Sequence, residues 1–235
     1  DQDSHFRARH IQYKSTSTLF ELEYPDGVIE INSPMIGRFN VQNVLASLAV
    51  GWVEGFNVFE MASQLSYFKG SPGRLENVNE GQKFSVFVDY AHTSDALRNI
   101  LSVLREVTDG RLLLVFGCGG DRDHKKRPLM TSAAQEYCDY VWATADNPRS
   151  EPLDSIFTHM KDGVQLPDHI KFVKDRRRAI SLAIEDAKPN DCLIIAGKGH
   201  ETYQEVNNTI IAFDDRRVTR ELLHIKSNFN GSQYQ

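Results

Sequence analysis

From Phe84 onward, short apolar runs alternate with amphipathic segments of helical periodicity, and this alternation restricts the fold more than any other feature of the chain. Strands are expected at 84–88, 111–116, 140–145, 170–173 and 191–196, and helices near 94–107, 127–138, 153–161 and 176–187. Repeated strand–helix units of this length form a mostly parallel sheet with helices on both faces. The sequence therefore predicts a Rossmann-like, doubly wound α/β domain over residues 71–235. We expect it to end with a strand at 209–213, parallel or antiparallel, and a helix from Asp214.

The first 70 residues follow a different pattern. Alternating residues predict strands at 9–13, 18–24 and 28–31, with a turn at 24–27 between the last two. Helices are expected from Asn40 and at about 58–68. The cluster Lys69-Gly70-Ser71-Pro72-Gly73 breaks regular structure, so we place a domain boundary there, between residues 70 and 71.

Charge and cysteine content exclude several functional classes. The 27 basic and 32 acidic residues give a net charge of −5, which argues against a nucleic-acid-binding protein. No apolar stretch approaches the roughly 18 residues of a membrane span, and the first residues do not form a signal peptide. The three cysteines are widely spaced, which indicates a reducing compartment and no zinc site. We therefore expect a cytoplasmic monomer with small-molecule partners.

Polar clusters follow four of the predicted strands, at 89–92, 117–123, 146–151 and 197–201. In doubly wound sheets, ligands bind beyond the carboxyl ends of the strands, and all four clusters belong to that edge. Each also has a plain structural explanation. Gly117-Cys118-Gly119-Gly120 could be only a tight turn, and Asp146-Asn147-Pro148 could only start one. The guanidinium fork of Arg149 is different, because it suits the recognition of a carboxylate.

Two basic runs, 125–127 and 176–178, are expected to form solvated helix faces, although the first follows a glycine loop and could contact phosphate.

Taken in order, the motifs resemble those of the Mur ligase family from about Ile36 to Val218. They are 37–43, Pro72-Gly73-Arg74-Leu75-Glu76, Asp89-Tyr90-Ala91-His92-Thr93, 117–130, Asp146-Asn147-Pro148-Arg149 and 197–204. The Asp-Asn-Pro-Arg motif is typical of the branch that adds meso-2,6-diaminopimelate to UDP-N-acetylmuramoyl-L-alanyl-D-glutamate. The resemblance implies an ATP-dependent amide ligase of peptidoglycan precursor synthesis, with ATP and Mg²⁺ as its cofactors.

The resemblance also implies roles for the matching residues. A diaminopimelate site would comprise Arg122, Asp146, Asn147, Pro148, Arg149, Gly197 and Glu201. An ATP site would comprise Asn43 at the adenine, Arg74 at the phosphates, Asp89 at the ribose, and His92. Glu201 would read the distal amino group of diaminopimelate; alternatively, it starts a helix and only complements the helix dipole.

Family members have three domains, and the central one carries a Gly-Lys-Thr phosphate loop, magnesium ligands and a carbamylated lysine. No Gly-x-x-x-x-Gly-Lys-Ser/Thr motif occurs in this chain, which also begins without Met. The resemblance thus implies that residues 1–70 are the tail of a central α/β ATPase domain and 71–235 the C-terminal domain. We expect no catalytic residue and no metal site within such a fragment.

Two rival functions stay open at this point. A sister ligase that uses L-lysine would share the fold and the ATP contacts, but Arg149 favours a carboxylate that lysine lacks. A nucleotide-binding module without ligase activity, or a folate-type relative, would not need Arg122, Arg149 and Glu201 together.

Overall fold

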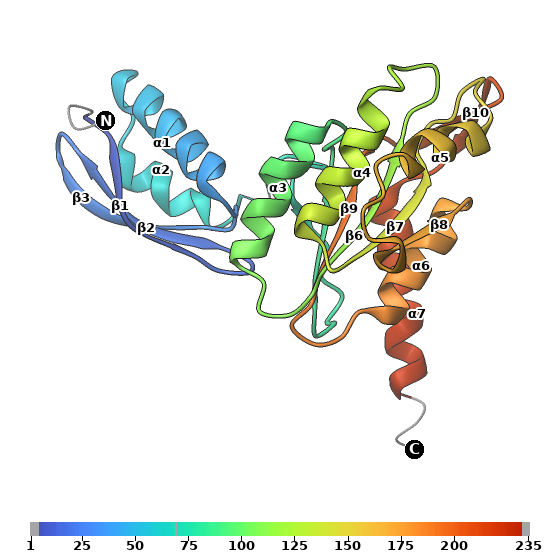
Figure 1. The fold of residues 1–235 in the computed structure, drawn as a ribbon. Helices are drawn as coiled ribbons and strands as arrows, with labels where there is room; N and C mark the ends of the chain where they lie inside the picture. Colours follow the sequence, from blue (N-terminus) through green and yellow to red (C-terminus); the bar gives the residue numbers. More distant parts are fainter. Residues whose placement is uncertain (1–4, 69, 232–235) are drawn as a thin grey trace. The chain divides into compact units, whose positions relative to one another are not determined.

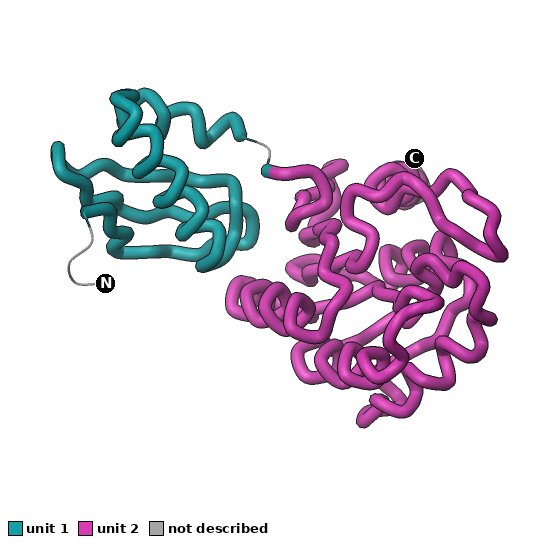
Figure 2. Tube along the Cα trace, turned by 90° about the horizontal axis from the view of Figure 1, so that it is seen from above, with its two compact units in different colours: residues 1–70 teal, residues 71–235 magenta. Residues whose placement is uncertain are grey.

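The computed structural model describes residues 5–68 and 70–231, without the side chains of 228–231. The chain divides into two compact units, residues 1–70 and 71–235 (Figure 2). Among the described residues, no helix is both long enough and apolar enough to span a membrane.

The first unit is a three-stranded antiparallel sheet packed against two helices. The strands β1 (Arg7–Tyr13), β2 (Thr18–Tyr24) and β3 (Gly27–Ser33) pair in that order. The helices are α1 (Arg38–Val53) and α2 (Val58–Leu65). The core consists of Phe20, Leu22, Ile31, Val41, Val44, Leu48 and Val58. The predicted strands and helices are confirmed, although α1 begins two residues before the expected start at Asn40.

The second unit contains a six-stranded sheet of order β4-β5-β9-β6-β7-β8. Its strands are β4 (Glu76–Asn77), β5 (Ser85–Asp89), β6 (Leu112–Cys118), β7 (Tyr140–Ala145), β8 (Ile170–Val173) and β9 (Cys192–Ala196). All pairs are parallel except β4 with β5. The five parallel strands are the five expected from the sequence. Strand β4 was not foreseen, because two residues are too few to show a periodicity.

Helices cover both faces of this sheet, which confirms the doubly wound α/β fold. The helices α3 (Ser94–Glu106), α4 (Lys126–Tyr137) and α5 (Leu153–Lys161) contact one another in sequence, and α3 and α4 lie side by side in Figure 1. The helices α6 (Arg176–Asp186) and α7 (Asp215–Gly231) pack together against Val86, Val88, Leu113, Val115, Leu193 and Ile195. Because side chains alternate along a strand, the intervening residues face the other layer.

A short hairpin follows the last parallel strand. It joins β10 (Tyr203–Val206) to β11 (Thr209–Ala212) and forms a sheet of its own. The expected strand at 209–213 is therefore present and antiparallel, but it pairs with β10 rather than with the central sheet. A 3-10 turn, η1 (Pro167–His169), precedes β8.

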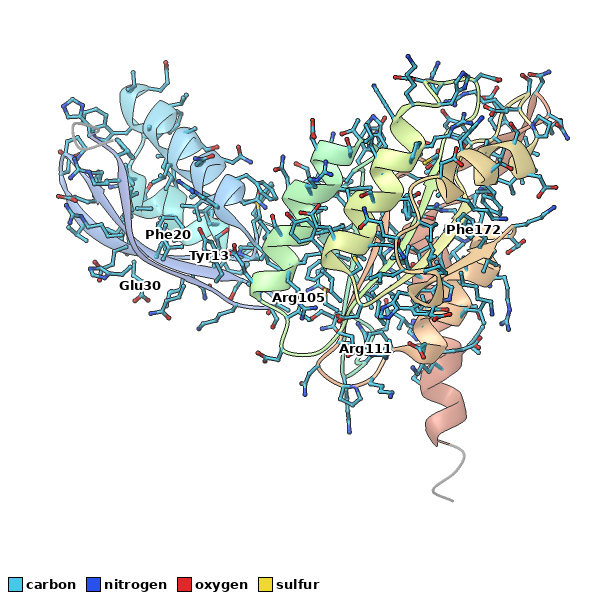
Figure 3. All side chains as sticks on the ribbon, in the orientation of Figure 1. Tyr13, Phe20, Glu30, Arg105, Arg111 and Phe172 are labelled. Atoms are coloured by element: carbon cyan, nitrogen blue, oxygen red, sulfur yellow. The ribbon has the colours of Figure 1, made fainter. Side chains whose placement is uncertain are left out.

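Charged side chains at the edge where the parallel strands begin are engaged in structural contacts. Arg111 bonds to Asp191 and Asp186 at 2.8 Å each, and Arg105 bonds to Asp139 at 2.8 Å. Figure 3 shows Arg105 and Arg111 near this edge of the sheet. These ion pairs hold loops and strand ends together, whereas the polar clusters named above lie at the opposite edge.

Candidate functional site

A cavity of about 430 Å³ opens at the carboxyl ends of β5, β6, β7 and β9. All four polar clusters contribute to its wall, as the sequence predicts. Its lining includes His92, Gly117, Gly119, Arg122, Asp146, Asn147, Arg149, Gly197 and Glu201. A cavity of this size is typical of sites for small molecules.

The glycine-rich turn after β6 packs closely on the loop after β7. A Cβ atom on Gly120 would collide with the carbonyl of Pro148, and one on Gly117 would lie 2.8 Å from the amide nitrogen of Asp146. The Gly120 amide also donates to the carbonyl of Asn147 at 2.9 Å. The glycines are therefore required for this close approach, which brings the two loops together at the cavity.

Asp146 directly follows β7, and one of its carboxylate oxygens has no partner among the described residues. Its Oδ1 accepts a hydrogen bond from the Asn147 amide at 2.8 Å, while Oδ2 has almost no accessible surface and accepts no hydrogen bond from the described part of the chain. A Cβ atom on Gly197 would lie 2.7 Å from Oδ2, so glycine leaves space at this oxygen. Burial raises the pKa of Asp146, although the nearby charges of Arg176 and Lys198 oppose that change.

Asn147, Lys198 and Glu201 form a hydrogen-bonded group in the cavity wall. The Lys198 ammonium donates to Asn147 Oδ1 at 2.9 Å and to Glu201 Oε2 at 3.0 Å. The Asn147 amide nitrogen donates to the same Glu201 oxygen at 3.0 Å. Glu201 precedes β10 and is not part of a helix, so the alternative that it starts a helix is wrong.

Arg149 is held in an unusual conformation by the β10–β11 hairpin. Its φ angle of 55° lies in the left-handed region. Its amide donates to the Glu205 carbonyl at 2.9 Å, and its carbonyl accepts from the Asn207 amide at 2.7 Å. The guanidinium donates to the Gly120 carbonyl at 2.8 Å and lies 3.4 Å from the Glu205 carboxylate. The hairpin, which the sequence did not reveal, thus fixes the arginine at the cavity.

Arg122 adds a second positive charge to the cavity. It is exposed, and no hydrogen bond or ion pair joins its guanidinium to another described residue. Together with Arg149 it provides two planar donor groups next to the carboxylates of Asp146 and Glu201.

The residues expected at ATP lie in several places. The Arg74 guanidinium lies 4.8 Å from the centre of the Tyr90 ring, and His92 and His200 lie with ring centres 4.7 and 5.3 Å from it. Both Asp89 oxygens accept backbone amides, from Leu75 at 2.8 Å and Ala91 at 2.7 Å.

Burial raises the pKa of Asp89, and its two backbone hydrogen bonds oppose that change. Neither Arg74 nor Asp89 lines the cavity, whereas His92 does. Asn43 is exposed on α1 of the first unit.

Two arginines expected on solvated faces are buried. Arg127 is 1% exposed and donates to both oxygens of Glu151 at 2.6 Å, and to the Gly119 carbonyl. These bonds lower the pKa of Glu151 to about 2. Arg176 is also 1% exposed and pairs with the fully buried Asp215. The expectation was wrong for these two residues because the first turns of α4 and α6 direct them toward the acceptors Glu151 and Asp215 and away from solvent.

One group of three potential metal ligands occurs among the described residues: His124, Glu151 and His159. It does not fit Mg²⁺, which prefers oxygen ligands, because two members are imidazoles. In addition, both oxygens of Glu151 and Nδ1 of His159 are already bonded to Arg127.

Comparison of the chain with known families identifies two matching domains. The Mur ligase glutamate ligase domain matches residues 73–199, and the Mur ligase middle domain matches residues 1–51.

Several curated proteins are similar over most of the chain. The UDP-N-acetylmuramoyl-L-alanyl-D-glutamate–2,6-diaminopimelate ligase of Solibacter usitatus is 46% identical, over 94% of this chain and 45% of the relative. A protein of the same name from Halalkalibacterium halodurans is 42% identical, over 95% of this chain and 46% of the relative. Another from Synechocystis sp. is also 42% identical, over 96% of this chain and 45% of the relative. The chain thus spans about half the length of the curated relatives it matches.

Solved structures give a consistent picture. A structure of UDP-N-acetylmuramoyl-L-alanyl-D-glutamate–2,6-diaminopimelate ligase is 37% identical, with a TM-score of 0.76 over 97% of this chain and 47% of that one. A folylpolyglutamate synthase from Mycobacterium tuberculosis, complexed with ADP, is 24% identical with a TM-score of 0.63 over 83% of this chain and 45% of that one. At that identity the similarity concerns the fold alone.

Proposed function

The chain belongs to the Mur ligase family, and on that basis we propose that it is the amino-acid-binding part of a longer ATP-dependent ligase. The proposed reaction adds meso-2,6-diaminopimelate to UDP-N-acetylmuramoyl-L-alanyl-D-glutamate. Residues 71–235 would be the C-terminal domain, and residues 1–70 the end of the central ATP-binding domain. The curated relatives that carry this activity in their names support the proposal.

The observation that carries the proposal is a single cavity with charges of both signs. Arg122 and Arg149 supply guanidinium groups, while Asp146 and Glu201 supply carboxylates. The end of diaminopimelate away from the reaction carries both an ammonium and a carboxylate. A site that selects it needs a donor fork for the carboxylate and an anion for the ammonium.

The same charges argue against the L-lysine-adding alternative. Lysine has an ammonium at its far end but no carboxylate there. In a complex with lysine, Arg122 would face no anionic group of the ligand, and Arg149 would keep only Glu205 as its anionic partner. Diaminopimelate brings a carboxylate for these guanidinium groups as well as an ammonium for the carboxylates, and so we propose it as the substrate. Asn147, Pro148 and Gly197 would shape the site.

For ATP we propose Arg74 at the phosphates, Asp89 and His92 at the ribose side, and Asn43 at the adenine. Arg74 is exposed and its guanidinium lies over the Tyr90 ring, and no hydrogen bond or ion pair joins that guanidinium to the other residues that the structure describes. This supports its assignment as a group that binds an anion. Since the group of His124, Glu151 and His159 does not fit Mg²⁺, we propose that the rest of the central domain supplies most of the ligands of this ion.

In the proposed reaction, ATP transfers its terminal phosphoryl group to the D-glutamyl carboxylate. The amine of diaminopimelate then attacks the acyl phosphate, loses a proton, and releases inorganic phosphate as the amide forms. This chain would bind and orient the amine, which lowers the barrier by positioning rather than by acid–base chemistry. We propose that the reaction takes place in the cytoplasm and that the ligase acts as a monomer.

A substrate comparison tests the proposal. The complete gene product that contains this chain is incubated with ATP, Mg²⁺ and UDP-N-acetylmuramoyl-L-alanyl-D-glutamate, and phosphate release is measured. We expect release that depends on meso-diaminopimelate and is far slower with L-lysine. Equal or preferential use of L-lysine would favour the sister ligase, and no release with either amino acid would remove the ligase proposal.

A further inference from the structure

Lys198 is a buried charged residue that the proposed contacts with diaminopimelate leave unexplained. Its side chain has no exposed surface, although it lies in a loop between two glycines. A buried ammonium is costly unless all its donors find partners. The partners of Lys198 therefore indicate what the residue does.

Two of the three donors of the Lys198 ammonium have hydrogen-bond partners in the cavity wall. An ammonium has three N–H donors. Two of them bond to Asn147 Oδ1 and Glu201 Oε2, and the nitrogen lies 5.4 Å from the centre of the Tyr203 ring. Lys198 does not itself line the cavity, but both of its hydrogen-bond partners do.

The bond to Asn147 fixes which way its amide points. Asn147 Oδ1 accepts from Lys198 at 2.9 Å and from the Glu205 amide at 3.1 Å. A flipped amide would place its NH₂ group against two donors, so Nδ2 must face Glu201, to which it donates at 3.0 Å. Lys198 and the Glu205 amide thus together fix the orientation of the Asn147 amide.

The bond to Glu201 determines which carboxylate oxygen stays free. Oε2 accepts from both Lys198 and Asn147, whereas Oε1 has no bond to another described residue. The side chain of Glu201 is 21% exposed and lines the cavity. The arrangement therefore leaves Oε1 as the oxygen with capacity to bind a ligand.

We propose that Lys198 is a positioning residue that orders Glu201 and Asn147 for the incoming amino acid without touching it. The inference rests on the proposed function, since it assumes that these two residues bind diaminopimelate. Without the ammonium, Glu201 would lose one of its two anchors, and the Asn147 oxygen would keep only the Glu205 amide as a donor. The expected consequence is weaker binding of the amino acid with little change in the use of ATP.

The test uses the complete gene product and the substitution Lys198→Met, which keeps length and removes charge. We expect KM for meso-diaminopimelate to rise about tenfold or more, because charged hydrogen bonds are lost, while KM for ATP stays within about twofold. Lys198→Gln is a second variant for the case that Lys198→Met does not fold. It keeps one neutral donor and should show a smaller rise of the same kind.

Arg111→Met is the matched control. Arg111 also pairs with a buried carboxylate, Asp191, but at the opposite edge of the sheet. Its loss should lower the melting temperature and leave both KM values unchanged. If Lys198→Met instead changes both KM values equally, or changes neither, Lys198 has only a structural role and the proposal is wrong.

A combined substitution separates positioning from direct contact. If Lys198 acts only through Glu201 and Asn147, adding Lys198→Met to an enzyme that already carries Glu201→Gln and Asn147→Ala should raise KM for diaminopimelate no further. Multiplying effects would mean that Lys198 contacts the substrate by itself, which would overturn the proposal. If the unmodified enzyme does not use diaminopimelate at all, the proposed function fails and this inference fails with it.

Discussion

Removing one partner of the buried ion pair between Arg176 and Asp215 should strongly destabilise residues 71–235. Arg176 Nε and Nη2 donate to the two oxygens of Asp215 at 2.8 and 2.7 Å, and neither side chain has exposed surface. Arg176 also donates to the carbonyls of Ala145 and Ala196 at 3.2 and 2.9 Å. The pair thus joins α6 and α7 to the ends of β7 and β9.

Asp215→Asn keeps the size of the side chain and leaves the arginine charge without its counter-ion. Removing one partner of a buried pair costs about 3–5 kcal/mol, because the other charge is left uncompensated. In a unit of this size each kcal/mol lowers the melting temperature by roughly 2–4 °C. We therefore expect a loss of about 10 °C, with a range of roughly 6–20 °C.

The same two helices provide a matched control. Arg177 and Glu221 also join α6 to α7, at 2.9 Å, but their side chains are 45% and 39% exposed. An exposed pair contributes less than about 1 kcal/mol, so Glu221→Gln should lower the melting temperature by only a few degrees. Differential scanning calorimetry of the 235-residue chain measures both variants. Equal losses for the two substitutions would refute the reasoning that an uncompensated buried charge costs more than the loss of an exposed pair.

Three further predictions concern other residues and the chain itself. In the complete enzyme, Arg149→Ala should raise KM for diaminopimelate by ~30- to 1,000-fold, from roughly 2–4 kcal/mol of lost charged hydrogen bonds, and leave KM for ATP nearly unchanged. An equal effect on both substrates in steady-state kinetics would indicate general disruption. Hydrogen bonds from Arg127 lower the pKa of Glu151 to about 2. The stability that ionised Glu151 contributes to the folded protein is therefore fully present above the ordinary pKa of 4.5 and is lost as the pH falls toward 2. The difference in melting temperature between wild type and Glu151→Gln should thus shrink between about pH 5 and about pH 2, and a constant difference would contradict this reasoning. Purified residues 1–235 should show no ligase turnover, since they lack a phosphate loop; phosphate release that requires both the UDP-linked dipeptide and diaminopimelate would disprove it.

The sequence predicted the layers of the fold because strands buried on both faces are almost continuously apolar. Strands β6 and β9 contain no charged residue, and the helix after β5 shows a clear buried stripe. The rule that ligands bind at the carboxyl ends of parallel strands then placed the cavity. Strand β10 was missed because its four residues include Gln204 and Glu205, and because it pairs with the other hairpin strand rather than with the central sheet.

The part of the site that could not be predicted is the set of charged side chains that pair with other residues inside the protein. Arg127 and Arg176 each belong to a run of three basic residues, and such runs usually face solvent. Their partners Glu151 and Asp215 lie 24 and 39 residues further along the chain, so no local pattern connects them. Lys198 between two glycines gives no sign of burial. A search for acidic residues at strand ends and helix starts could have suggested partners for the two arginines.

The strand order has a consequence for how the polypeptide folds as it is made. Strand β9 lies between β5 and β6, yet it is synthesised roughly a hundred residues after β5. At translation rates of about 5–20 residues per second, β9 is synthesised on the order of ten seconds after β5. During that time the backbone groups of β5 and β6 that will bond to β9 have no partner strand. Until β9 is inserted, those strand edges can pair with other chains, so residues 71–235 can aggregate late in synthesis. Folding of this unit therefore depends on contacts between residues that are distant in sequence.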